Sequence, residues 1–257
     1  MATLGPTKLD YFDEMGKLQS KSRITTTSQE SDGKQALILE STIFYPQGGG
    51  QTSDTGLISG ADHSFKFLVE DVRSKGGVVF HYGHFETGAE EFGSGKLDGK
   101  EVLLCVDEAR RELNSRLHSA GHLIDVCLEN VGLGHLEPGK GYHFPDGPYV
   151  EYKGTVVQDT WQTMQTKLEL EANALISKGG KITAAILTYE EASNPCGGIL
   201  PDYISKSSNP RIVSLGNNPG CPCGGTHVPD ISDIKSVKVT QLRSKKGKTK
   251  VFYNVDS

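Results

Sequence analysis

The sequence predicts an α+β fold, and three observations lead to this prediction. Up to about residue 106, short apolar runs bounded by Gly, Asp and Ser are typical of strands. From Asp107, apolar residues recur every three or four positions, as in an amphipathic helix. A second helical pattern follows Asp159, and strand-like runs flank both helices. We therefore expect two domains, residues 1–106 and residues 107–257, with the helices of the second on one face of a mainly antiparallel sheet.

The expected strands of the first domain are short and lie between polar turns. They are the segments ALILE, SFKFLVEDV and GGVVFHYGHF, and, after the Gly-rich stretch TGAEEFGSGKLDGK, EVLLCV. In the last of these we expect Cys105 at a core position.

The helices have clear start and stop signals. Asp107 is a suitable N-cap for the first helix. Its apolar stripe consists of Ala109, Leu113, Leu117, Ala120, Ile124 and Cys127. The stripe of the second helix consists of Trp161, Met164, Leu168, Ala172 and Leu175. Gly179–Gly180 should end this helix, because glycine is common just past a helix C-terminus.

The strands of the second domain end in a basic hairpin. They are the segments GPYVEYKGTVV, KITAAILTY and RIVSL, and then SVKVTQLRSKKGKTKVFYNV, with a turn at Lys246–Gly247. Seven basic residues follow one another there without an acidic one: Lys235, Lys238, Arg243, Lys245, Lys246, Lys248 and Lys250. Such a hairpin can contact nucleic-acid phosphates. Alternatively, its lysines protect an exposed edge strand from aggregation.

Composition restricts the class of protein. The net charge of −5 argues against a general nucleic-acid binder, and we expect no DNA partner. No apolar run approaches the length of a membrane span, and the first residues lack the apolar region of a secretory signal. The five cysteines show no disulfide pattern, so a reducing, cytoplasmic location with free or metal-bound thiols is expected.

Two motifs supply candidate metal ligands. In HSAGH, His118 and His122 are four residues apart on the first helix, so both imidazoles can reach one ion. In CPCGGTHV, Cys223 and His227 bracket a glycine loop that can curl around an ion. Cys221 competes with Cys223 as the ligand, and an incidental Gly-rich turn is the alternative. Cys196, in NPCGGIL, has no following histidine, and we interpret it as structural.

The segment FYPQGGGQTSDTG contains three consecutive glycines, Gly48, Gly49 and Gly50. It has neither the Lys-Ser/Thr of a P-loop nor a G-x-G-x-x-G pattern. Glycines permit a positive φ and the close approach of a backbone to another group. The segment is therefore either a functional loop or a tight structural turn between two strands.

Taken in order, FYPQGGGQTSDTG, RLHSAGHLIDVCLE and CGGTHV resemble the editing portion of alanyl-tRNA synthetase and its free-standing relatives, the AlaX trans-editing proteins. The resemblance implies an N-terminal β-barrel-like module followed by a two-layer α/β sandwich editing domain. It also implies Zn²⁺ bound by His118, His122, Cys223 and His227. Since 257 residues leave no room for aminoacylation domains, it implies a separate protein that hydrolyses mischarged tRNA(Ala), bound by its acceptor end.

Such an enzyme is needed because an alanine pocket cannot strongly reject serine. We expect it to remove serine mainly, and glycine more slowly. On this interpretation Gly48 to Gly50 approach the terminal adenosine, and Gln51 positions the attacking water or the carbonyl. Thr42 and His143 are the candidate partners of the serine hydroxyl. Whether the zinc is catalytic, structural or positions the substrate stays open, as does the oligomeric state.

Two other functions are compatible with the sequence. One is a non-catalytic, zinc-stabilised tRNA-binding module, which explains the metal motifs and the basic hairpin. Gln51 and the glycine loop favour the enzyme over this alternative, because a binding module does not need them. The other is a zinc hydrolase of small esters or amides, against which the basic hairpin argues.

Overall fold

A computed structural model describes residues 4–89, 92–93, 95–198 and 200–256. The chain forms two compact units. The first consists of residues 1–48 and 52–112, and the second of residues 49–51 and 113–257. The division along the chain thus falls inside the first helix, a few residues after the boundary expected before Asp107. The three residues 49–51 are separated in sequence from the rest of their unit.

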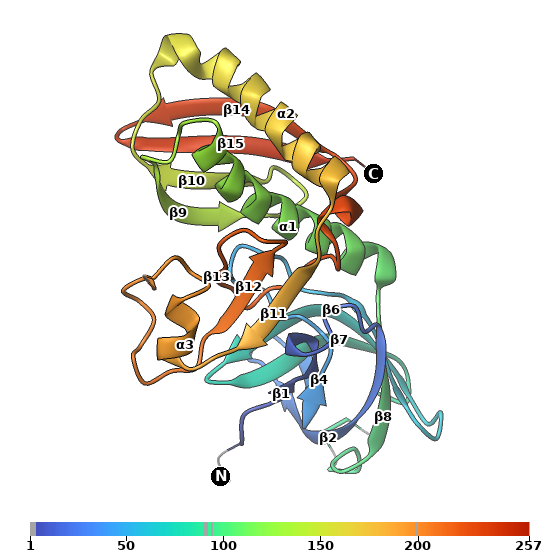
Figure 1. Cartoon of the computed structure of the whole chain (residues 1–257). Helices are drawn as coiled ribbons and strands as arrows, with labels where there is room; N and C mark the ends of the chain where they lie inside the picture. The colour runs from blue at the N-terminus through green and yellow to red at the C-terminus, as the bar shows by residue number, and fades with distance from the viewer. Residues whose placement is uncertain (1–3, 90–91, 94, 199, 257) are drawn as a thin grey trace. The chain divides into compact units, whose positions relative to one another are not determined.

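The first unit is a closed six-stranded barrel (Figure 1), and the expected barrel-like module is confirmed. Its antiparallel strands, in barrel order, are β2 (Gln19–Gln29), β3 (Gln35–Leu39), β7 (Val78–Thr87), β6 (Lys66–Lys75), β5 (Gly56–Gly60) and β8 (Glu101–Val106). The short strands β1 (Lys8–Leu9) and β4 (Ser41–Thr42) pair in parallel, and the 3-10 helix η1 (Asp10–Phe12) follows β1. Aliphatic and Phe side chains fill the barrel interior.

One expectation for this unit was wrong: Cys105 is exposed. Its neighbours Leu104 and Val106 are buried, and successive side chains of a strand point to opposite faces. The alternation of β8 therefore directs Cys105 outward.

The base of the glycine-rich segment is fixed within the first unit. The Tyr45 N–H donates to Oδ2 of Asp54 at 2.6 Å, and the Asp54 N–H donates to the Tyr45 carbonyl at 3.0 Å. The Asp54 carboxylate also forms a buried ion pair with Arg111. These contacts close the base of the loop at residues 45 and 54 within the first unit.

The second unit contains two helices on one face of an antiparallel sheet (Figure 1). The helices are α1 (Glu108–Asn130), whose first turn belongs to the first unit, and α2 (Trp161–Lys178). The sheet order is β14 (Val237–Lys245), β15 (Lys248–Val255), β10 (Tyr149–Lys153), β9 (Glu137–Tyr142). The apolar stripes of both helices pack on Val150, Tyr152, Val239, Val251 and Tyr253. This is the expected two-layer α/β arrangement.

A second sheet of the same unit was not expected. The three-stranded sheet β11 (Ile182–Ile186), β12 (Arg211–Leu215), β13 (Cys221–Pro222) is separate from the four-stranded one. The sequence predicts one sheet, because strand patterns do not specify which strands pair. The remaining elements are the short helix α3 (Tyr189–Ser193) and the 3-10 helices η3 (Gln158–Thr160) and η4 (Ile231–Ile234).

The helix ends follow the sequence signals. Oδ1 of Asp107 accepts from the Arg110 N–H at 3.1 Å, which is the expected N-cap contact. Gly179 ends α2 with a φ of 69°, and its N–H donates to the carbonyls of Ile176 and Leu175. The hairpin turn lies at Lys246–Gly247, where both residues have positive φ. No helix among the described residues is long and apolar enough to cross a membrane.

Candidate functional site

The four predicted metal ligands lie together in the second unit. The ligand atoms of His118, His122, Cys223 and His227 all lie within 4.8 Å of one another. Helix α1 supplies the first two from consecutive turns, and the loop after β13 supplies the others. Sγ of Cys223 lies 3.5 Å from Nε2 of His118 and 3.3 Å from Nε2 of His227. In a tetrahedral zinc site with Zn–S near 2.3 Å and Zn–N near 2.0–2.1 Å, sulfur and nitrogen ligands are separated by about 3.5 Å.

The donor set fits Zn²⁺ in two further respects. Nε2 of His122 is buried without a hydrogen-bond partner among the described residues, and a bound metal would satisfy it. Burial raises the pKa of the Cys223 thiol, but the nearby imidazoles of His118, His227 and His122 lower it more, so it lies well below the usual 9.0. Burial also lowers the pKa of His227 to about 3. Burial opposes the charging of His122 as well, but Cys221 and Cys223 raise its pKa well above 6.5. A thiolate and neutral imidazoles are the forms that bind zinc, so Cys223 and His227 already have the required form, whereas His122 would lose a proton when an ion binds.

Cys221, the competing ligand, has a different position. Its Sγ lies 3.3 Å from Nδ1 of His122, and it is not a member of the four-residue group. Asp125 Oδ2 lies 3.6 Å from the same nitrogen. Cys221 and Asp125 are therefore neighbours of the His122 ring, whereas Cys223 is the thiol that meets the other imidazoles.

Gln51 connects the loop tip to the metal ligands. Its Oε1 accepts from Nδ1 of His118 at 2.7 Å and from the Thr226 N–H at 3.1 Å, and its Nε2 donates to Oγ1 of Thr226 at 2.8 Å. Gln51 is fully buried. Both ends of the amide thus contact the protein, and its role toward water or the substrate carbonyl stays a prediction. Because Nδ1 of His118 donates to Gln51, its Nε2 is the nitrogen left for a metal.

The neighbouring glycines are required by close packing. A Cβ on Gly50 would lie 2.3 Å from the Gly141 carbonyl oxygen, and its φ is +79°. A Cβ on Gly225 would lie 2.2 Å from Nδ1 of His118 and 2.8 Å from Oε1 of Gln51. A Cβ on Gly121, in α1, would lie 2.3 Å from the His143 ring. Gly121 has a low helix propensity, and the histidine packed against it explains why a glycine stands inside the HSAGH motif.

His143 is held in one tautomer. The Tyr253 hydroxyl donates to the Leu117 carbonyl at 2.9 Å, so it accepts from Nδ1 of His143 at 2.6 Å. The His143 N–H donates to the Gly50 carbonyl at 2.8 Å. Burial, followed by His118 and His122, lowers the pKa of His143 well below 6.5. The ring is therefore neutral, with Nε2 as an acceptor. No local pattern in the sequence indicates the contacts of Tyr253 with His143 and Leu117.

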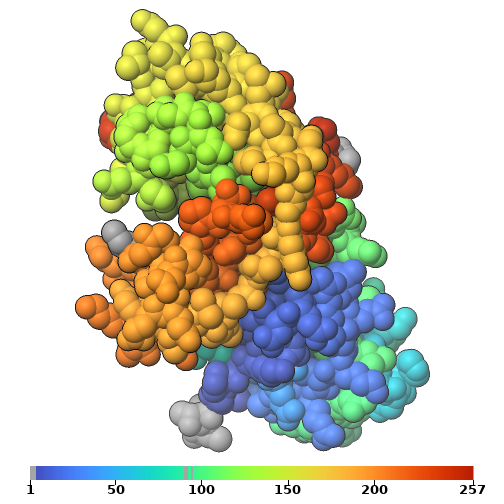
Figure 2. Space-filling model, in the orientation of Figure 1, coloured from blue at the N-terminus to red at the C-terminus, as the bar shows by residue number. Residues whose placement is uncertain are grey.

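These residues line a groove of about 890 Å³ in the second unit. Its walls come from the loop tip, α1, β9, β10 and residues between Pro201 and Gly224. The site residues among them are Gly49, Gly50, His118, His122, His143 and Cys223. Figure 2 shows its opening between the green surface of α1 and β9 and the orange segment that contains α3. A volume of this size is in the range of pockets that bind small-molecule ligands.

Two of the predicted substrate contacts, Thr42 and Gly48, lie in the first unit. The Thr42 side chain is fully buried, and its Oγ1 lies 2.8 Å from Nε2 of His81 and accepts from the Phe44 N–H at 3.0 Å. The Gly48 carbonyl accepts from the Tyr45 hydroxyl at 2.9 Å. Both residues therefore have partners inside the barrel unit.

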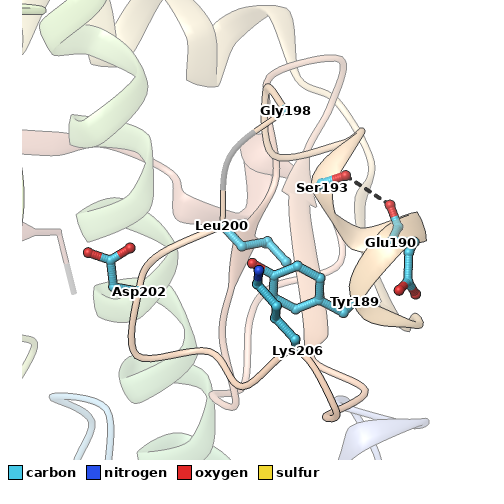
Figure 3. A pocket seen from close by; sticks show the side chains of 7 residues that line it. All are labelled: Tyr189, Glu190, Ser193, Gly198, Leu200, Asp202 and Lys206. Carbon is cyan, nitrogen blue, oxygen red and sulfur yellow. Dashed lines mark hydrogen bonds between the residues drawn. The ribbon is translucent and has the colours of Figure 1, made fainter.

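A second hollow lies beside α3 (Figure 3). It is lined by Tyr189, Glu190, Ser193, Gly198, Leu200, Asp202 and Lys206. The Ser193 hydroxyl donates to the Glu190 carbonyl at 2.8 Å, and the Asp202 side chain points away from Tyr189 and Lys206. The polar groups do not converge on one point, so we assign this hollow no chemistry.

The sequence matches two family models and an alanyl-tRNA editing protein. The family described as tRNA synthetases class II (A) matches residues 7–109, and the threonyl and alanyl tRNA synthetase second additional domain matches residues 211–251. The alanyl-tRNA editing protein AlaX-L of Pyrococcus horikoshii is 29% identical over 236 residues, which cover 91% of this chain. The chain is therefore similar to an AlaX editing protein over most of its length. The resemblance inferred from the three motifs is thus confirmed.

Two alanine–tRNA ligases are also similar to this chain. One, from Lachnoclostridium phytofermentans, is 29% identical over 235 residues, and one, from Granulibacter bethesdensis, is 31% identical over 217 residues. The chain covers 54% of AlaX-L but only 25% and 23% of the two ligases. It thus spans about half of one relative and a quarter or less of the others.

Proposed function

We propose that the protein is an aminoacyl-tRNA deacylase that hydrolyses mischarged tRNA(Ala) in trans, mainly Ser-tRNA(Ala) and more slowly Gly-tRNA(Ala). The observation that carries the proposal is the groove lined by three residues of a zinc-type ligand set and by His143, whose Nε2 has no hydrogen-bond partner among the described residues. The similarity to an alanyl-tRNA editing protein supports the substrate class.

His143 is the proposed serine-sensing residue. Its Nδ1 is occupied by the Tyr253 hydroxyl, so Nε2 is the acceptor on a ring that lines the groove. A serine hydroxyl can donate to this nitrogen, whereas alanine and glycine offer no donor. A neutral His143 is required for this contact, and its lowered pKa keeps it neutral near pH 7. One such hydrogen bond contributes roughly 1–3 kcal/mol, or tenfold to more than a hundredfold in rate.

His118, His122, Cys223 and His227 are the proposed holders of Zn²⁺. When bound, the ion would supply Lewis acidity toward the ester or a ligand position for the substrate amino group. Gln51 is a positioning residue in this proposal, since it acts through His118 rather than on the substrate. Gly49 and Gly50 supply backbone at the groove wall, next to where the terminal ribose would lie. The roles of Thr42 and Gly48 toward the substrate stay a prediction.

Hydrolysis itself needs water, the ester carbonyl and a stabilised oxyanion. Water adds to the carbonyl carbon, the bond to the ribose oxygen breaks, and a proton ends on that oxygen, which releases serine and free tRNA. In this proposal the groove orients the aminoacyl group between Nε2 of His143 and the metal-ligand set. A cytoplasmic location is part of the proposal, because the ligand set depends on a reduced Cys223.

The test is hydrolysis of Ser-tRNA(Ala) by the wild type, Cys223→Ala and Cys196→Ala. Cys196 is a matched control, since its thiol packs beside a separate small cluster that contains Ala192 and Ile212. We expect the Cys223 variant to lose zinc and activity, and the Cys196 variant to keep both. A wild type that binds zinc and tRNA but releases no serine would favour the alternative, a non-catalytic zinc-stabilised tRNA-binding module.

A further inference from the structure

The outer face of the four-stranded sheet carries an ordered row of aromatic rings. Register pairs Tyr142 with Tyr149, and Tyr149 with Phe252, so three adjacent strands place one ring each in the same row. The ring centroids are 5.4 Å apart for Tyr142 and Tyr149 and 5.3 Å apart for Tyr149 and Phe252. Phe144 stacks on Tyr142 at 4.5 Å. Val150 follows Tyr149 on β10, and Val251 precedes Phe252 on β15. Both valines are buried against the helices on the opposite face, so the aromatic row points away from the helices.

Cations occupy the next rows of the same face. In the first of these rows, strand register pairs Lys250 with both Glu151 and Arg243. In the following row on the same face, Lys248 pairs with both Lys153 and Lys245. Nζ of Lys250 lies 3.8 Å from the Tyr149 ring centroid, and Cζ of Arg243 lies 5.2 Å from that of Phe252.

The carboxylates on this face are fewer than the cations. Glu151 forms ion pairs with Lys248 at 2.8 Å and Lys250 at 3.7 Å, and Glu137 forms one with Lys153 at 3.5 Å. Oδ1 of Asp146 accepts from the Tyr142 hydroxyl. Among the described residues of these rows, Arg243 and Lys245 make no ion pair, and both side chains are exposed. The face thus keeps an excess of positive charge despite the negative charge of the whole chain.

The row begins at the edge of the groove. Tyr142 precedes His143, whose ring lines the groove, and Lys140 and Gly141 of the same strand β9 line it as well. A chain that leaves the groove over β9 therefore meets Tyr142 first, then Tyr149 and Phe252. Such continuity suits a ligand that is one polymer with the substrate.

We propose that this aromatic–cationic face, formed by Tyr142, Tyr149, Phe252, Lys250 and Arg243, binds the unpaired nucleotides next to the esterified 3′ end of the tRNA. The inference rests on the proposed function and adds the surface that receives the RNA. Bases stack on the aromatic row, as on other sheet surfaces that bind single-stranded RNA. Phosphates contact Arg243, Lys245 and the lysines beside them. Charge and ring spacing together select a single-stranded nucleic acid over an acidic protein surface, which offers no flat bases to stack.

The test uses uncharged RNA, so that binding is measured without hydrolysis. The probes are an acceptor-stem hairpin with an unpaired 3′ end and the same hairpin with a blunt end. We expect the wild type to prefer the unpaired end, and Tyr149→Leu/Phe252→Leu to weaken its binding about tenfold or more while leaving the blunt hairpin unchanged. Arg243→Ala should lower the salt slope for the unpaired-end probe by about 0.7.

The matched control is Phe80→Leu. Phe80 stacks on Tyr82 with centroids 6.0 Å apart and lies under Lys75, so it is the same kind of aromatic–lysine cluster in the barrel unit. Its RNA binding should equal that of the wild type. Wild-type affinity in the double Leu variant, or no preference for the unpaired end, overturns the inference. The inference is also overturned if the double Leu variant loses as much affinity for duplex DNA as for the unpaired-end RNA. A change in self-association of this variant without a change in its RNA binding overturns it as well.

A second variant guards against a folding failure of the double substitution. Tyr149→Trp keeps a stacking surface, and the chain has only one native tryptophan, so the new fluorescence is readable. The variant should bind the unpaired-end probe, and its fluorescence should be quenched by a stacked base. Unquenched fluorescence at saturating RNA contradicts the inference. If wild-type hydrolysis of Ser-tRNA(Ala) is absent while these binding effects are present, the proposed function fails and the RNA surface stands.

Discussion

Oε1 of Gln51 lies 2.7 Å from Nδ1 of His118, although the two residues are separated by 67 positions in the sequence. Both side chains are buried. The contact orients the imidazole of a candidate metal ligand from the tip of the glycine-rich loop. It gives the three glycines before Gln51 a physical purpose, because they bring this amide close to the ligand set without side chains of their own.

We predict that Gln51→Ala lowers zinc affinity about 10- to 100-fold, because the residue that orients a metal-binding histidine is lost. The Thr226 N–H also loses an acceptor, which costs roughly 1–3 kcal/mol of the free energy of unfolding. Competition with a chelator and chemical denaturation measure the two effects. Gln162→Ala, at an exposed position on α2, is the control and should change neither. Unaltered zinc affinity in the Gln51 variant would leave the contact without a role in metal binding.

The metal content itself is the second prediction. Purified protein should contain one zinc per chain, and Cys223→Ser should contain much less, because one of four ligands is replaced by a weaker donor. A chelator should lower the melting temperature of the wild type, since a ligand that binds only the folded state stabilises it. Elemental analysis and thermal melts provide the readout. Full zinc in the Cys223 variant would remove this residue from the ligand set.

The glycine loop supplies a third prediction, for Gly50→Ala. The added Cβ would lie 2.3 Å from the Gly141 carbonyl oxygen, so the loop tip must move away from β9 and its hydrogen bond to His143 must break. We expect a loss of several kcal/mol in the free energy of unfolding or a loss of deacylation. Gly33→Ala separates the steric clash of the added Cβ from the strain of a positive φ. Gly33 has a similar φ of +88° but open space around it. Equal effects of the two variants would assign the cost to backbone conformation alone.

The barrel unit should be sensitive to acid through His81. Burial lowers the pKa of this histidine to about 4, and its Nδ1 lies 3.0 Å from the Leu37 carbonyl oxygen. A histidine with a lowered folded-state pKa stabilises the protein fully above its unfolded pKa near 6.5, and this contribution falls as the pH drops toward 4. The contribution of His81 to the free energy of unfolding is up to about 3 kcal/mol. NMR titration checks this: His81 should stay neutral to about pH 4. Protonation of His81 near pH 6.5 would contradict the expectation.

Local signals in the sequence were sufficient for several features. The helix stripes, the cap at Asp107, the C-terminal Gly179 and the turn at Lys246–Gly247 depend on neighbours in the chain. The i, i+4 spacing of His118 and His122 is also local. The approach of Cys223 and His227 to this helix is a long-range contact, and it was inferred from the complementary chemistry of the two motifs.

Other features depend on contacts that no local pattern encodes. Strand β2, at Gln19–Gln29, was missed because Ile24 is its only buried apolar side chain and Ser and Thr fill most other positions. The separate sheet of β11, β12 and β13 was missed because strand partners are not written in strand patterns. The position of the Gln51 amide is visible only from its burial and from the partners of its oxygen in the structure. That Nε2 of His143 is an acceptor follows only from the hydrogen bond between the Tyr253 hydroxyl and the Leu117 carbonyl.

The most direct measurement is a set of single-turnover deacylation rates for serine, glycine and alanine on the same tRNA(Ala), with the wild type and His143→Ala. The serine ester should react tenfold to a hundredfold faster than the alanine ester in the wild type, because only serine donates to Nε2 of His143. Glycine should be slower than serine. In the His143 variant the serine rate should fall toward the alanine rate while zinc content is kept. Equal rates for serine and alanine in the wild type would contradict the proofreading function.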